Sequence, residues 1–109
     1  MKIVNIDARI SIVEKIRDGD LKYALELLSR LYDVPPPSFR VGTVKGHRKS
    51  TACYIASQKT ILFSNSEALL DPRIVLHEFY HHLTYHKTLK DGGTDKDADR
   101  FVRQFLLTP

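Results

Sequence analysis

The chain has 109 residues and a formal net charge of +4. Apolar residues make up 42% and charged residues 28%, a composition that excludes a disordered chain, while the length leaves no room for two full cores. The absence of a long apolar run excludes a membrane span, and a single cysteine, Cys53, excludes an internal disulfide.

We therefore expect one domain over residues 1–109. Residues 1–7 lack the apolar stretch of a signal peptide, so we expect a cytoplasmic protein with no membrane partner. Cys53 lies in a short apolar run and is expected to be a buried hydrophobe rather than a reactive thiol. The mild positive charge is weak evidence for a polyanion, and we do not expect a nucleic-acid partner.

The first third of the chain is predicted to be helical. Apolar residues recur at helical spacing over residues 8–32, and Gly19 divides this stretch into two helices. The triplet Pro35–Pro37 then ends the helical region, because proline lacks an N–H and restricts the residue before it.

Three short segments rich in β-forming residues come next, over Arg40–Val44, Thr51–Ala56 and Thr60–Ser64. A basic loop, Lys45–Lys49, separates the first two, and a short turn separates the second from the third. We predict that the three strands form an antiparallel meander.

Two helices are predicted to follow the strands. Asp71 and Pro72 are a helix-start signal for a helix over residues 72–86, and Thr94 is a capping residue for a last helix over residues 95–107. The order of helices, strands and helices predicts an α+β fold.

The helix predicted over residues 72–86 contains the pattern HExxH at residues 77–81. Residues four apart lie one turn apart on one helix face, so His77 and His81 can bind one cation. Glu78 lies beside this pair and can reach a metal-bound water without binding the metal. Apolar residues flank the motif, and burying these polar groups is costly unless they are paired or ligated.

A zinc site of this kind needs a third protein ligand. Asp95, Asp97 and Asp99 on the last predicted helix are the candidates. Asp95 and Asp99 share a helix face, so Asp95 can bind the metal while Asp99 accepts a hydrogen bond from a ligand histidine. Asp97 fits the capping box that begins at Thr94. The spacing alone leaves the choice among the three acids open.

These residues resemble the small gluzincin-type zinc metallopeptidases, namely the minigluzincins and the ImmA/IrrE-type regulatory peptidases. The matching text is HEFYH at residues 77–81, DKDADRF at residues 95–101 and LLTP at residues 106–109. The resemblance implies a minimal zincin-like fold in which His77, His81 and the acid at position 95 bind zinc. It also implies that Glu78 is the general base. The family usually has Glu where this chain has Asp95, and a small residue where it has Tyr80.

The expected function is therefore that of a zinc-dependent metalloendopeptidase acting on a peptide or protein substrate. Tyr80, Tyr85 and His82 are the residues nominated to stabilise the transition state. The strand Thr60–Ser64 is expected to offer its free edge to an extended peptide, with a side-chain contact from Asn65.

An alternative is a catalytically weak or latent module that holds a peptide or protein partner without turnover. The short acid at position 95 and the small size of the chain favour it. A second copy of the chain covering the cleft would produce such a latent state, so a homo-oligomer is compatible with the sequence.

Overall fold

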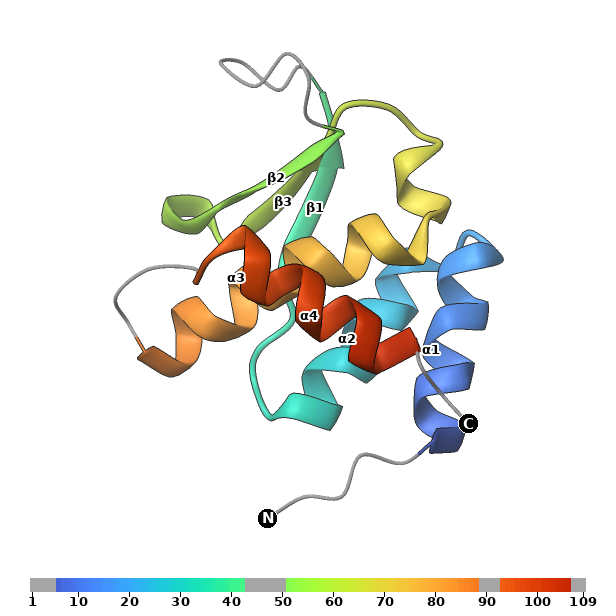
Figure 1. The fold of residues 1–109 in the computed structure, drawn as a ribbon. Coiled ribbons are helices and arrows are strands. Elements are labelled where there is room, and N and C mark those ends of the chain that lie inside the picture. Colours follow the sequence, from blue (N-terminus) through green and yellow to red (C-terminus); the bar gives the residue numbers. More distant parts are fainter. Residues whose placement is uncertain (1–5, 43–50, 89–92, 107–109) are drawn as a thin grey trace.

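The computed structural model describes residues 6–42, 51–88 and 93–106 and has the expected α+β fold (Figure 1). The elements in chain order are α1 (Ile6–Arg17), α2 (Leu21–Tyr32), β1 (Ser38–Val41), β2 (Ala52–Ile55), the 3-10 turn η1 (Ala56–Gln58), β3 (Thr60–Phe63), the 3-10 turn η2 (Ala68–Leu70), α3 (Pro72–Thr88) and α4 (Asp95–Leu106). The predicted basic loop Lys45–Lys49 and the end of the last predicted helix lie outside the described residues. None of the described helices has the length and apolarity that a membrane span requires.

The two N-terminal helices are confirmed, and the chain turns between them where the sequence has Gly19. This glycine has a φ of +87°, which an L side chain rarely adopts. Helix α2 ends at Asp33, whose φ of 60° directs the chain toward the proline segment. Apolar side chains of both helices are fully buried, and they form one side of the core (Ile12, Ile16, Leu21, Ala24, Leu25, Leu28).

The predicted antiparallel meander is wrong, because the sheet is mixed and has the order β1-β3-β2. Strand β2 pairs with β3 antiparallel as expected, but β1 pairs with β3 in parallel and does not contact β2 as a neighbour. All four residues of β3 are buried, whereas β1 is mostly exposed. The most apolar strand thus takes the central position, where both faces and both edges are covered.

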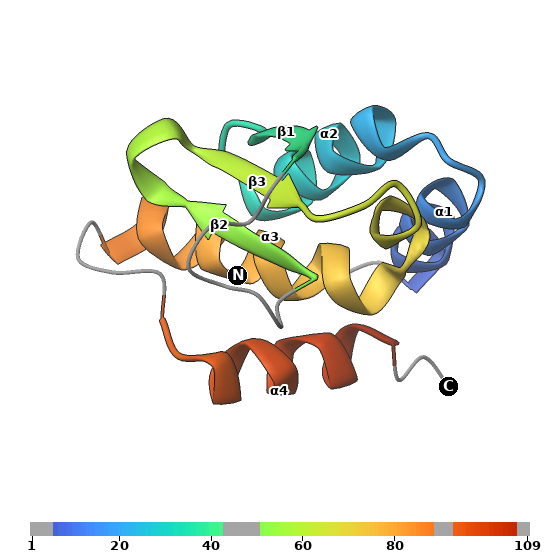
Figure 2. The same ribbon diagram turned by 90° about the horizontal axis from the view of Figure 1, so that it is seen from above.

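Helix α3 lies between the sheet and α4 (Figure 2). Its buried residues Val75, Leu76 and Phe79 join the apolar core. Helix α4 adds Val102 and Phe105 from the opposite side. Both neighbours of α3 therefore approach it closely, with β2 along one face and α4 along another.

Gly93, in the loop before α4, lies close to side chains of α3, so substitutions there measure how tightly this region is packed. A Cβ added at Gly93 would lie 2.9 Å from a ring carbon of Tyr80 and 3.2 Å from the Thr84 hydroxyl, whereas one at Gly19 would lie 3.7 Å from Leu70. Both glycines have positive φ, so each alanine variant loses about 1 kcal/mol through backbone strain. Gly93→Ala should lose roughly 1–3 kcal/mol more through overpacking. Equal losses in urea denaturation would contradict this packing.

Candidate metal centre

Helix α3 begins as the sequence predicts and presents two imidazoles on one face. The Asp71 carboxylate accepts the backbone N–H of Arg73 at 2.9 Å, which caps the helix start. One turn separates His77 from His81, and their Nε2 atoms are 3.3 Å apart. The side chains are 22% and 15% exposed, so both imidazoles are largely removed from water yet reachable.

The first turn of α4 brings Asp95 to this pair. Its Oδ1 atom lies 3.1 Å from Nε2 of His77 and 3.0 Å from Nε2 of His81. The Thr94 hydroxyl accepts the backbone N–H of Asp97 at 3.1 Å, so the predicted cap of the last helix is present. Two imidazole nitrogens and one carboxylate oxygen thus converge on one point, and the three residues form a group that could hold a metal ion.

The spacing of these three atoms fits a small tetrahedral cation. Tetrahedral zinc has bonds of about 2.0–2.1 Å to nitrogen and oxygen, which separates neighbouring ligand atoms by about 3.3–3.4 Å. The observed separations run from 3.0 to 3.3 Å. The shorter arm of Asp95 therefore reaches the imidazoles, because α4 packs directly against α3.

Asp99 lies where a supporting carboxylate is expected. Its Oδ1 atom is 2.9 Å from Nδ1 of His77. When Nδ1–H donates to this carboxylate, Nε2 of His77 presents its lone pair to the three-atom group. Asp97 points elsewhere, and its nearest charged partner is Arg100 at 3.8 Å. Of the three acids that the sequence left open, only Asp95 joins the group with both imidazoles.

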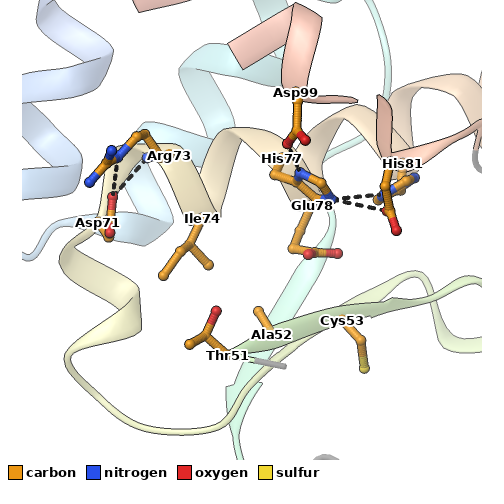
Figure 3. A pocket seen from close by; sticks show the side chains of 11 residues that line it. Thr51, Ala52, Cys53, Asp71, Arg73, Ile74, His77, Glu78, His81 and Asp99 are labelled. Atoms are coloured by element: carbon orange, nitrogen blue, oxygen red, sulfur yellow. Dashed lines mark hydrogen bonds and ion pairs between the residues drawn. The ribbon is translucent and has the colours of Figure 1, made fainter. Parts of the chain in front are cut away.

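Glu78 lies on a neighbouring face of α3, between the imidazoles and β2, and its side chain extends toward the strand (Figure 3). It is 8% exposed. Burial raises the pKa of the Glu78 carboxyl, while His77 and His81 partly oppose that shift. The backbone amide of Tyr54 donates a hydrogen bond to the carboxylate. The hydrogen bonds to His77 and His81 hold the pKa of Asp95 below its usual range, so the two acids have different environments.

A cavity of about 700 Å³ opens in front of these groups (Figure 3). Parts of β2, α3 and α4 line it (Thr51, Ala52, Cys53, Asp71, Arg73, Ile74, His77, Glu78, His81, Asp95, Asp99). Cys53 is partly exposed at this surface, so the expectation of a buried cysteine is wrong.

The prediction that the strand Thr60–Ser64 offers a free edge to a peptide is also wrong. Strand β3 is central and both of its edges are paired, so residues 60–63 have no free edge. The edge beside the cavity belongs to β2. Ser64 N–H donates to the Thr51 carbonyl at 2.9 Å, and because hydrogen-bonded pairs alternate in an antiparallel ladder, the main-chain groups of Ala52 and Tyr54 face away from β3. Asn65 accepts the backbone N–H of Ala68 and lies outside the cavity lining.

None of the three residues nominated for transition-state stabilisation lines the cavity in the described part of the chain. His82 is 0% exposed, which corrects its nomination, and it is bonded to Tyr54 and to the Pro35 carbonyl. Tyr80 packs against Phe101. Tyr85 lies beside Tyr54 and His86.

Sequence reasoning missed Tyr54, which contacts both Glu78 and His82. The only sequence feature that pointed to such a residue was the adjacent pair His81-His82. If the second imidazole is buried, it needs a polar partner, and Tyr54 is one.

Comparison with known proteins found no matching family model, curated protein or solved structure.

We expect wild-type protein to bind one zinc ion per chain, and Asp95→Asn to weaken binding by more than the roughly 10- to 100-fold typical of a supporting residue. The amide has no negative charge to offer the cation. Asp97→Asn, a matched change in the same helical turn, should leave the affinity unchanged. Competition with a chromogenic chelator measures the zinc affinity of both variants. A larger loss of affinity in Asp97→Asn than in Asp95→Asn would show that Asp97, not Asp95, is the third ligand.

Asp99→Asn should weaken zinc binding by about 10- to 100-fold while the stoichiometry stays at one. The amide can still accept a hydrogen bond but supports the His77 imidazole without a charge. Calorimetric titration gives both quantities. An affinity equal to that of the wild type would show that the contact between Asp99 and His77 does not orient the imidazole.

Proposed function

We propose that this chain is a zinc-dependent metallopeptidase with a minimal zincin-like fold. In this proposal His77, His81 and Asp95 hold the zinc ion, and Glu78 is the general base. The observation that carries it is a buried carboxylate beside three converging ligand atoms, at the mouth of a cavity bordered by a free strand edge. The resemblance of residues 77–81 and 95–101 to gluzincin-type peptidases supports the same function.

Zinc bound by two imidazoles and a carboxylate lowers the pKa of a bound water and polarises a carbonyl group. The protein's own part in the reaction lies with Glu78. Its carboxylate accepts a proton from the attacking water and then donates that proton to the leaving amine. Burial between α3 and β2 suits this role, because it keeps the carboxylate close to the reacting groups and away from bulk water.

The free edge of β2 supports an extended peptide as the substrate. The main-chain groups of Ala52 face this edge, so a peptide can pair with β2 as an added strand. Thr51 lies at the Ile74 end of the cavity and Cys53 toward the His81 end, so such a peptide would run along α3 past Glu78 (Figure 3).

One observation favours a second function, a peptide-binding module with weak or no turnover. Among the described residues that line the cavity, Arg73 is the only arginine or lysine, and its side chain is paired with Asp71 at 3.9 Å. No tyrosine or further histidine in this lining is present to stabilise an oxyanion. Zinc and a peptide would still bind to this site. The two functions differ in whether Glu78 takes part in bond cleavage.

Glu78→Gln should lower the turnover of a generic protein substrate by about 10²- to 10⁴-fold, because the amide cannot accept the proton. Zinc affinity should be retained, since Glu78 is outside the ligand group. Glu67→Gln is the matched control, because Glu67 is exposed and lies outside the cavity lining. A zinc-loaded wild type that binds peptides but cleaves none, at the level of Glu78→Gln, would establish the binding module instead.

A further inference from the structure

Tyr54 contacts α3 at two successive turns. Its main-chain amide, which faces the free edge of β2, donates a hydrogen bond to the Glu78 carboxylate. Its hydroxyl lies 2.8 Å from Nδ1 of His82. Glu78 and His82 are four residues apart and therefore lie on one face of α3. A single strand residue thus contacts both the buried carboxylate and the turn that follows it.

The direction of these hydrogen bonds follows from the chemistry of the last partner. Nε2 of His82 lies 2.7 Å from the Pro35 carbonyl oxygen. A carbonyl only accepts, so Nε2 carries the hydrogen, and in the neutral imidazole Nδ1 then presents a lone pair. The Tyr54 hydroxyl then donates to Nδ1. The result is a directed chain from β2 through α3 to the segment that precedes β1.

Burial makes this chain of hydrogen bonds rigid. The His82 ring is enclosed by Phe79 and His86, with ring centroids 5.9 and 4.7 Å away. Burial also raises the pKa of the Tyr54 phenol to about 12, so the phenol keeps its proton and remains a donor. Buried polar groups are costly to leave without partners, which holds the Tyr54 side chain on His82.

We propose that Tyr54 is a positioning residue for Glu78, because its anchor on His82 fixes the edge of β2 along α3 and so holds the Tyr54 amide on the carboxylate. This inference rests on the peptidase function proposed above. It assigns separate tasks to the neighbouring histidines: His81 faces the ligand group, and His82 acts from the buried face through Tyr54.

The consequence concerns the chemical step more than substrate binding. Without the hydroxyl, β2 would keep its ladder with β3 but would lose the hydrogen bond that ties it to His82 on α3. The amide of residue 54 would then hold Glu78 less often, and a displacement of about 1 Å at a reacting group can cost about 100-fold in rate. The three ligand atoms belong to α3 and α4 and would keep their positions.

The first measurement is amide hydrogen exchange by NMR in wild type and Tyr54→Phe, which keeps the ring. The ladder places Cys53 and Ile55 in hydrogen-bonded pairs with β3, whereas the amide of residue 54 has only Glu78. We expect the amide of residue 54 to exchange about tenfold faster in Tyr54→Phe, with Cys53 and Ile55 unchanged. Equal acceleration of all three would overturn the inference, because the hydroxyl would then only stabilise the sheet.

The second measurement is turnover of the zinc-loaded protein. Tyr54→Phe should lower kcat by about 10- to 100-fold, with KM and zinc affinity changed far less. Tyr32→Phe is the matched control: its ring also packs on α3, against Phe79, and its hydroxyl has no hydrogen-bond partner among the described residues.

The two proposals fail in different ways. An active wild type whose kcat and residue-54 amide are unchanged by Tyr54→Phe, or a Tyr32→Phe variant with the same loss, would overturn the role of Tyr54 alone. A wild type that binds zinc and cleaves no peptide would overturn the peptidase function itself, and a catalytic role for Tyr54 with it.

Discussion

The candidate site depends on one packing contact, that of the first turn of α4 against the middle of α3. Each helix alone presents an incomplete set of donors, two imidazoles on α3 and one carboxylate on α4. Packing brings Oδ1 of Asp95 to 3.1 and 3.0 Å from the two Nε2 atoms. Gly93 permits this close approach, because a side chain there would overlap Tyr80. The capped start of α4 then fixes which acid faces the imidazoles.

Helix α3 contacts α4 with one face and β2 with another. The face with His77 and His81 is directed at α4, and the face with Glu78 and His82 is directed at β2. This division separates the groups that could bind a metal ion from Glu78, which would act on a substrate, and from the buried His82, which contacts Tyr54. It also gives each of these four polar side chains a partner on a neighbouring element, as groups removed from water require.

Local sequence signals predicted the helices of the fold, but they did not predict how segments distant in the sequence pair with one another. Periodicity, Gly19 and the Asp71-Pro72 start gave the helices, because these features act within a few residues. The predicted strand order was wrong because the parallel pairing of β1 with β3 depends on which strand is most completely buried. The candidate ligands were predictable because HExxH is a local helical pattern. The choice of Asp95, and the part played by Tyr54, depend on contacts across 14 and 28 residues.

The exposure of Asp95 bears on what a metal ion would do for the fold. This carboxylate is 83% exposed, whereas the two imidazoles are mostly covered. The contacts of such an exposed acid add little to the stability of the fold, because ion pairs at the protein surface are weak in water. A cation shared with these two partly exposed imidazoles changes this balance, because binding to the folded state alone stabilises that state by mass action. In the proposed zinc site the ion would therefore both supply the chemistry and tie α4 more firmly to α3.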